Sequence, residues 1–524
     1  MENFMQISLI RFVFVCLCML AFQGNAATSK DKIAQIEQHI DRVMTEFQVP
    51  GVAIAIVKDG EVVLEKGYGV TNVATGQLVN ETTLFGIASN TKAMTAALLA
   101  QLVDEGKISW RTKVSDIIPE FQMPDAYVTR QFTVIDLLAH NSGLGLGAGD
   151  LMIWPHTDHS LSDIIKGIRY LPEESSFRSE FAYDNLMYII AGEVIARVTG
   201  KPWHVVIQQR IFDPLGMEST KPFYSMIDSS NKNVANAHVP LNGKLNVVGG
   251  NFLEKFAAAG SVASNVKDMG KWLKAILNEG NYGAEQSLFS ERQSHFMWQP
   301  KTLLPVSKNA TKDYGMNFYA YGLGWFLNDI HGYKMVHHSG GILGMVSKVA
   351  LIPEEKLGVV VLTNQQSGSA FNAIFREVLQ QYLDIPKTDW LAFYQQREAK
   401  YAARLVEQRE NQAAARDVNS KPSLPLASYA NVYKDNWYGD IEISLHDGQL
   451  HMQFTRTKAL AGVLEHFQHN TFIVRWHDRT LEADAYVNFD LNEDGSIEQA
   501  TMKAVSDKTD FSFDFHDLTL KVKK

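Results

Sequence analysis

Residues 84–121, LFGIASNTKAMTAALLAQLVDEGKISWRTKVSDIIPEF, decide the fold and the candidate chemistry of this chain. Ser89 and Lys92 stand three residues apart at the start of an apolar run, and residues at this spacing share one face of a helix. A neutral lysine can take the proton of a nearby serine hydroxyl and so make it a nucleophile. We therefore predict a buried helix over 89–105, stopped by Gly106, whose first turn carries a nucleophilic Ser89.

The Ser-x-x-Lys spacing is weak evidence by itself, because the chain contains four such pairs. Ser89 differs from the other serines because it begins an apolar helix, where backbone N–H groups and the helix dipole stabilise negative charge on an oxygen. Burial would lower the pKa of Lys92 toward that of a neutral base. The structural alternative is a helix-capping Ser89 with Lys92 reaching toward the surface. The serines of the other three pairs lie in less suitable places. Ser29 adjoins a candidate cleavage site, Ser229 lies in a polar loop, and Ser264 is the expected N-cap of another helix.

Two further short patterns lie downstream of this helix. The stretch FAYDNLMYIIAGEVIARVTG carries Tyr183 and Asn185 directly before a helical segment, and MVHHSGGILGM carries His338-Ser339-Gly340 on a predicted strand. Tyr-x-Asn and His-x-Gly each occur elsewhere in the chain, so neither pattern is specific alone. Each residue also has a purely structural interpretation. Tyr183 could be an aromatic residue of the core, Asn185 a turn residue and His338 a histidine within a strand.

In their order along the chain, these segments resemble the serine β-lactamase and penicillin-binding protein superfamily. Within it, the sequence is similar to the class C β-lactamase-like group, which also includes esterases and D-amino-acid peptidases. Residues 257–273, AAAGSVASNVKDMGKWL, resemble another segment of that group, and the resemblance covers roughly residues 30–385. It implies a β-lactamase/transpeptidase-like α/β (α+β) domain, with an antiparallel sheet, flanking helices and a helical subdomain.

The resemblance also implies roles for the residues of these patterns. Ser89 would attack a carbonyl carbon, and Lys92 and Tyr183 would share its proton, with the choice of base between them left open. Asn185 offers a donor and an acceptor, which suits it to orient Lys92 or a substrate amide. The backbone N–H groups of Ser89 and Gly341 would form the oxyanion hole. The remaining site residues lie on the third pattern and would contact the substrate or assist catalysis: His338, Ser339 and Gly340.

The third pattern departs from the family's Lys-Thr-Gly, because His338 replaces a permanently charged lysine. A histidine is mostly uncharged at neutral pH unless its neighbours raise its pKa. We therefore predict a serine hydrolase that forms an acyl-enzyme with an ester, an amide or a D-amino-acid peptide. The alternatives are a penicillin-binding DD-carboxypeptidase or β-lactamase, and a non-catalytic binding or regulatory protein that keeps the fold. Two other histidines are interpreted as structural: His337 and His140.

The composition excludes several classes of protein. Of 524 residues, 46% are hydrophobic and 20% charged, which is typical of a globular chain and not of a disordered or fibrous one. A formal net charge of -9 argues against a general nucleic-acid binder. The resemblance implies a small-molecule or peptide substrate. No His-Glu-x-x-His pattern or nearby cysteine accompanies the histidines, and we expect neither a metal nor a cofactor. The oligomeric state does not follow from the sequence.

The N-terminus has the three-part pattern of a secretory signal. Arg11 precedes an apolar run from Phe12 to Phe22, and small residues follow up to Ala26. The run is shorter than the roughly 20 apolar residues that a membrane span needs. We expect residues 1–26 to be cleaved, which leaves a periplasmic protein with no stable membrane anchor and no cysteine.

Composition shifts divide the rest of the chain. We expect a hydrolase domain over 27–385, a polar helix and proline-containing linker over 386–420, and an all-β domain over 421–524. Short alternating strands in the last segment favour a small antiparallel sandwich or barrel. Its position after the hydrolase domain is similar to that of lipocalin-like appendages in part of the family. The resulting hypothesis is that this domain shields or narrows the active-site cleft.

Overall fold

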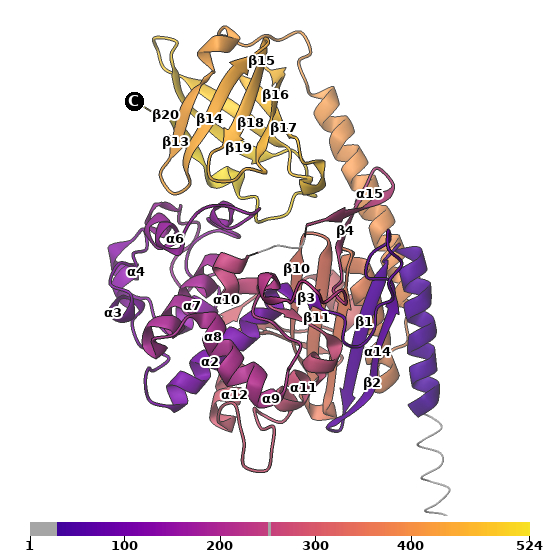
Figure 1. Cartoon of the computed structure of the whole chain (residues 1–524). Coiled ribbons are helices and arrows are strands. Elements are labelled where there is room, and N and C mark those ends of the chain that lie inside the picture. Colours follow the sequence, from indigo (N-terminus) through magenta and orange to yellow (C-terminus); the bar gives the residue numbers. More distant parts are fainter. Residues whose placement is uncertain (1–28, 250–252, 524) are drawn as a thin grey trace, which may run out of the picture.

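The computed structural model describes residues 29–249 and 253–523 as a large α/β domain with a smaller β-barrel stacked on it (Figure 1). The predicted signal segment, 1–26, lies outside the described residues, as do both cysteines. A long helix, α15 (Trp390–Ala414), leads from the large domain to the barrel along one side of the molecule (Figure 1). In the described part of the chain, no helix is both long and apolar enough to cross a membrane.

The large domain is built on an eight-stranded antiparallel sheet in the order β2-β1-β12-β11-β10-β9-β8-β7. The sheet joins the first hairpin to strands from the far end of the domain, since Ile54 pairs with Val361. Positive φ angles at Asp59 and Gly60 form the tight turn of that hairpin, as Asp-Gly predicts. The strands are β1 (Gly51–Lys58), β2 (Glu61–Gly69), β7 (Thr302–Leu303), β8 (Tyr319–Tyr321), β9 (Phe326–Ile330), β10 (Tyr333–Ile342), β11 (Met345–Ile352) and β12 (Leu357–Thr363).

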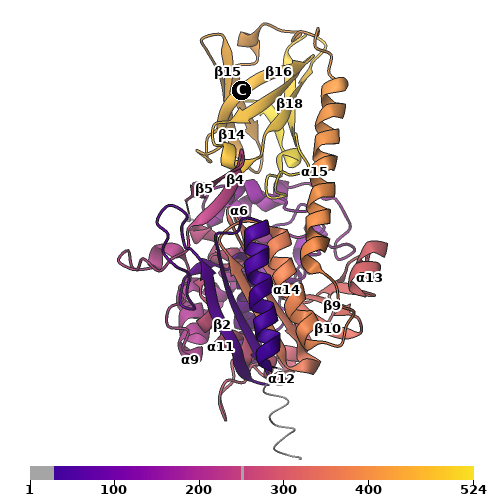
Figure 2. The ribbon, with the colours of Figure 1, turned by 90° about the vertical axis from the view of Figure 1, so that its right-hand side faces the viewer.

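Helices cover both faces of this sheet. The helical residues 29–46, together with α14 (Gly368–Tyr382) and the start of α15, cover one face and share a hydrophobic core with it (Figure 2). The larger core on the other face holds α2 (Thr91–Asp104), α7 (Asn185–Thr199) and α11 (Val266–Leu277). The antiparallel sheet, its flanking helices and the helical subdomain confirm the predicted fold class.

The remaining helices form the subdomain beside the sheet or connect strands. They are α3 (Val114–Ile117), α4 (Ala126–Gln131), α5 (Val134–Leu138), α6 (Leu161–Gly167), α8 (Trp203–Ile207), α9 (Asp213–Leu215), α10 (Ala257–Gly260), α12 (Glu291–Met297) and α13 (Lys308–Tyr314). Two small ribbons pair β3 (Phe85–Gly86) with β6 (Ala263–Ser264) and β4 (Ala237–Leu241) with β5 (Lys244–Val248). The expected N-cap at Ser264 is wrong: Ser264 ends β6, and the side chain of Asn265 caps α11 by accepting from the Asp268 N–H.

The C-terminal domain is a closed barrel of eight antiparallel strands, which resolves the choice between sandwich and barrel. Its ends meet where Tyr433 of the first strand pairs with Val522 of the last. Fully buried aromatic rings such as Phe454 and Trp476 pack against each other in its core. The strands are β13 (Asn431–Asp435), β14 (Gly439–His446), β15 (Gln449–Phe454), β16 (Ala461–Gln468), β17 (Thr471–Trp476), β18 (Ala485–Leu491), β19 (Ile497–Ala504) and β20 (Thr519–Val522).

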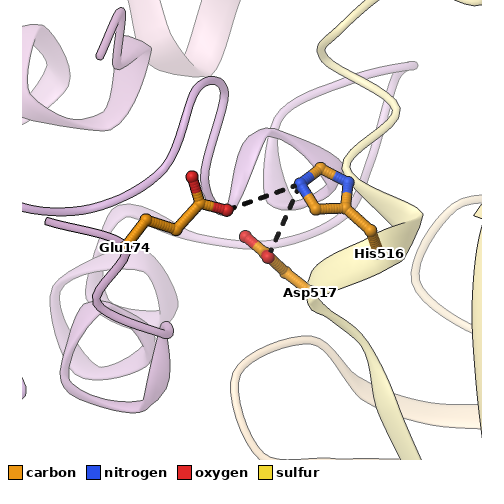
Figure 3. A group of neighbouring side chains, drawn as sticks. All are labelled: Glu174, His516 and Asp517. Atoms are coloured by element: carbon orange, nitrogen blue, oxygen red, sulfur yellow. Dashed lines mark ion pairs between the residues drawn. The ribbon is translucent and has the colours of Figure 1, made fainter. Parts of the chain in front are cut away.

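The barrel contacts the helical subdomain through charged side chains. Arg456 of the barrel pairs with Asp163 of α6 at 2.8 Å. Figure 3 shows a second group, in which Nε2 of His516 lies 4.0 Å from Oε1 of Glu174 in the large domain and 3.6 Å from Oδ1 of Asp517. The two pairs that cross between the domains, Arg456 with Asp163 and His516 with Glu174, are exposed on both sides. Exposed pairs contribute at most about 1 kcal/mol each, so the buried contacts described below matter more to how the barrel sits.

Candidate active site

Ser89 lies in a short 3₁₀ turn, Ala88–Asn90, between β3 and α2. This corrects the predicted helix start, because α2 begins at Thr91 and Ser89 precedes its first turn. Ala88 takes a positive φ of 47°, a left-handed conformation that is strained for a residue with a Cβ atom.

Two buried side chains hold the strained turn in place. Nδ2 of Asn90 donates to Oγ of Ser347 at 2.8 Å, and Ser347 donates to the carbonyl oxygen of Ile87 at 2.7 Å. Ser347 belongs to β11, so these bonds tie the turn to the central sheet. Ser89 itself remains partly exposed, as a group that meets a substrate must be.

Lys92 is fully buried on the first turn of α2. Its Nζ atom lies 3.0 Å from Oγ of Ser89, 2.7 Å from Oδ1 of Asn185 and 2.8 Å from the carbonyl oxygen of Ala259. The last two oxygens can only accept hydrogen bonds. A neutral amine has two N–H bonds and one lone pair, so a neutral Lys92 that satisfies both acceptors directs its lone pair at Ser89.

The electrostatic surroundings favour the neutral amine. Burial lowers the pKa of Lys92 to about 7, although the carboxyl groups of Asp150 and Asp184 oppose the shift. Near neutral pH a substantial share of the Lys92 side chains therefore carries the lone pair that a proton acceptor needs.

Tyr183 lies in the loop that enters α7, where its hydroxyl is close enough to Ser89 for that serine to oppose the rise in its pKa. Burial raises the pKa of Tyr183 well above its usual value, so its hydroxyl keeps its proton at neutral pH. The ring packs against that of His140, with centroids 4.2 Å apart. Nδ1 of His140 accepts the backbone N–H of Asp184 at 3.1 Å, so the buried His140 orders the loop that presents Tyr183.

The structure places His338 on β10 near Tyr183, with ring centroids 6.2 Å apart. Its Nδ1 donates to the carbonyl oxygen of Ser339 at 2.6 Å, and its Nε2 accepts from the hydroxyl of Tyr321 at 3.0 Å. Burial lowers the pKa of His338 to about 3, so the ring is neutral across the physiological range. His338 thus supplies no cation, and both ring nitrogens are already hydrogen-bonded. Its neighbour His337 is also buried and stacks on the ring of Phe326.

The end of β10 packs directly against the turn that holds Ser89. A Cβ atom on Gly340 would lie 2.2 Å from the carbonyl oxygen of Ile87 and 2.9 Å from Cβ of Ala88. Only glycine fits there. Gly341 differs, because it is exposed and a Cβ atom on it would meet nothing within 4 Å. Ser339, partly exposed, precedes them, so the strand end borders the open side of Ser89.

Several residues that lie behind this group were not predicted from the sequence. Oδ2 of Asp150 accepts hydrogen bonds from Nδ2 of Asn185 and from Oγ of Ser512, each at 2.8 Å. Asp514 accepts from the backbone N–H groups of Gly149 and Leu151, at 2.6 and 3.0 Å. Neither acid belongs to a short motif, and Ser512 and Asp514 come from the barrel, so local sequence carries no signal for them.

The described residues offer two groups in which three His, Asp or Glu ligand atoms lie within 4.8 Å of one another. One is the group in Figure 3, Glu174, His516 and Asp517; the other is Glu279, Glu291 and His295. Neither contains a residue hydrogen-bonded to Ser89 or Lys92.

The chain is similar in sequence to several curated proteins. The chain is 28% identical over 492 residues to the "Unguisins hydrolase ungD" of Aspergillus violaceofuscus, covering 86% of this chain and 83% of the relative. It is 30% identical over 435 residues to the "Unguisins hydrolase ungD'" of Aspergillus campestris, covering 78% and 76%. "Protein flp" of Staphylococcus aureus is 28% identical over 412 residues, covering 78% and 71%.

The chain also resembles a solved structure and matches two protein families. The octameric penicillin-binding protein homologue from Pyrococcus abyssi superposes with a TM-score of 0.58 at 21% identity, covering 93% of this chain and 99% of that one, which shows a shared fold. Residues 415–522 match a domain of unknown function, DUF3471. Residues 36–382 match the beta-lactamase family, and they contain every predicted site residue. The chain belongs to the β-lactamase family of serine hydrolases and penicillin-binding proteins.

Proposed function

We propose that this protein is a serine hydrolase that forms an acyl-enzyme through Ser89. The observation that carries the proposal is the hydrogen-bond geometry of Lys92, whose two other partners are oxygens that only accept. That arrangement directs the lone pair of the neutral amine at the Ser89 hydroxyl, 3.0 Å away. Lys92 is fully buried beside the partly exposed Ser89. Burying a lysine in this way is costly, and it suits a catalytic site better than a site that only binds.

The reaction then follows from the positions of the groups. Lys92 takes the hydroxyl proton while Oγ of Ser89 bonds to the substrate's carbonyl carbon. The backbone N–H groups of Ser89 and Gly341 stabilise the negative charge on the carbonyl oxygen. As the bond to the leaving group breaks, the Tyr183 hydroxyl gives its proton to the leaving atom and is reprotonated from Lys92. Water later hydrolyses the acyl-enzyme and returns the proton to Ser89.

We assign the substrate to esters, amides or D-amino-acid peptides. The neutral His338 stands where a lysine of the family would hold a substrate carboxylate. Two relatives named as hydrolases of unguisins support hydrolysis over a purely binding role. A penicillin-binding carboxypeptidase or a β-lactamase remains the second candidate because of the family match.

Mass spectrometry after exposure to a fluorophosphonate, and separately to a penicillin, tests the proposal. We expect a stable fluorophosphonate adduct on the peptide that contains Ser89 and no lasting penicillin adduct. A lasting penicillin adduct on Ser89 would instead favour a penicillin-binding protein. No adduct with either probe would support a non-catalytic binding protein and overturn the proposal.

The rate of fluorophosphonate labelling should fall as the pH drops below about 7. Protonation of Lys92, whose pKa is about 7, removes the lone pair that accepts the Ser89 proton. Asp150 and Asp184, with pKa values of about 8 and about 7, titrate in the same range, so the acid limb belongs to the coupled group. His338 does not contribute, because it is neutral throughout. Labelling rates measured from about pH 5 to pH 9 check this, and a flat profile would argue against Lys92 as the base.

A further inference from the structure

We propose that the barrel domain supplies a positioning residue to the active site: Ser512 fixes the orientation of Asn185 through Asp150, and so directs the Lys92 amine at Ser89. This inference rests on the proposed function. It concerns a residue outside the region that matches the β-lactamase family, which ends at residue 382.

A continuous chain of hydrogen bonds links the two domains. Oγ of Ser512 donates to Oδ2 of Asp150 at 2.8 Å, and the same oxygen accepts from Nδ2 of Asn185 at 2.8 Å. Oδ1 of Asn185 then accepts from Nζ of Lys92 at 2.7 Å, and Nζ lies 3.0 Å from Oγ of Ser89. The chain starts in the barrel and ends at the candidate nucleophile.

The orientation of the Asn185 amide decides what the Lys92 lone pair can do. With its oxygen toward Lys92, Asn185 accepts one N–H bond of the neutral amine, and the lone pair is left for Ser89. With the amide turned over, its NH₂ group would donate to Lys92 and occupy that lone pair. Asp150 prevents this, because its Oδ2 is an acceptor and requires the NH₂ group on its own side.

The barrel in turn holds Asp150. Asp514 accepts hydrogen bonds from Gly149 and Leu151, the residues on either side of Asp150, so its carboxyl group clamps that backbone. Phe511 packs closely on Gly147, where a Cβ atom would lie 2.8 Å from its ring, and meets the ring of Tyr183 edge-on at 5.9 Å. The segment from Phe511 to Asp514 therefore docks on the loop that carries Asp150, and Ser512 is its contact with the carboxyl group.

The charged groups around Asp150 predict how the pH profile would respond. Burial raises the pKa of Asp150, which faces Lys92, Asp184 and Asp514, to about 8, and the Ser512 hydrogen bond opposes that rise. Asp150 is therefore already mostly neutral at the pH values below about 7 where Lys92 is protonated. Loss of the Ser512 hydrogen bond raises the pKa of Asp150 further and leaves the carboxyl group neutral there, so the acid limb of the labelling profile should keep its position. The effect is expected on the plateau rate.

The test compares fluorophosphonate labelling of full-length variants. We expect Ser512→Ala to lower the labelling rate on the pH plateau by about tenfold, the factor that one hydrogen bond of ordinary strength supplies. Its acid limb should keep its position. Ser512→Thr, which keeps the hydroxyl, should restore the plateau rate. The matched control is Ser496→Ala, in the turn between β18 and β19 at the other end of β19 from this segment, and it should match the wild type.

A second pair of variants guards against loss of folding. Thr and Val have the same shape and differ in one hydroxyl, so Ser512→Thr and Ser512→Val compare the hydrogen bond at equal volume if Ser512→Ala unfolds. Equal plateau rates in this pair would overturn the inference, as would a Ser512→Ala variant that behaves like the wild type. If the wild-type protein is not labelled at all, the proposed function fails first. A merely structural Ser512 would lower the melting temperature without a difference in plateau rate between the folded Ser512→Thr and Ser512→Val variants.

Discussion

Ser89→Ala should abolish fluorophosphonate labelling and lower any hydrolysis of ester or amide substrates by at least about a thousandfold. The variant removes the only atom to which the acyl group would bond. The fold should persist, because Ser89 is partly exposed and Asn90 and Ser347 hold its turn independently of its side chain. We expect the free energy of unfolding to change by less than about 1 kcal/mol.

Ser229→Ala is the matched control for this variant. Ser229 also stands three residues before a lysine, but the pair is exposed and Lys232 donates only to the carbonyl oxygen of Ser229. Labelling, hydrolysis and stability should all match the wild type. Residual labelling of Ser89→Ala at the wild-type rate would show that another nucleophile reacts, and peptide mapping would locate it.

Gly340→Ala should damage both stability and activity. The new methyl group would lie 2.2 Å from the carbonyl oxygen of Ile87 and 2.6 Å from Oγ of Ser347, so the strand and the turn that carries Ser89 must move apart. We expect a loss of about 1–3 kcal/mol in the free energy of unfolding, the usual effect of overpacking, measured by urea denaturation. Labelling should fall by about a hundredfold, because the turn must shift and displacements on the order of 1 Å strongly slow catalysis.

Gly341→Ala provides the comparison at the next residue. Its methyl group would meet nothing within 4 Å and would project from an exposed position, so stability should stay within about 0.5 kcal/mol of the wild type. Any effect on activity should then depend on the bulk of the substrate. If Gly340→Ala and Gly341→Ala were equally stable, the close packing of β10 on the Ser89 turn would be refuted.

Sequence patterns predicted the features that depend on neighbouring residues in the chain, such as a buried helix. The apolar run after Lys92 indicates a buried helix, and the three-residue spacing from Ser89 indicates a shared face. The exact start of α2 was missed because the turn depends on the positive φ of Ala88 and on the bond from Asn90 to Ser347 in a distant strand. Alternating patterns in the last hundred residues likewise indicated an all-β domain but not the closure that pairs its first and last strands.

Two residues that the sequence did not reveal, Asp150 and Ser512, contact each other between the two domains. Asp150 and Ser512 are separated by 362 positions, and neither lies in a recognisable motif, so only the docking of the barrel brings them together. The pairing of His338 with Tyr321 was missed for a related reason, since it depends on the register of three neighbouring strands. Sequence reasoning thus identified the residues that face a substrate more readily than those that orient them.

The docking of residues 511–514 onto the loop around Asp150 also sets an order of events during synthesis. The turn that carries Ser89 leaves the ribosome long before the barrel does, and the hydrogen bond from Ser512 to Asp150 cannot form until 362 further residues have followed Asp150. A newly made chain therefore contains Ser89 and Lys92 before the segment that contacts Asp150 has been synthesised. Under the proposed role of Ser512, the site is complete only once the C-terminal domain has docked.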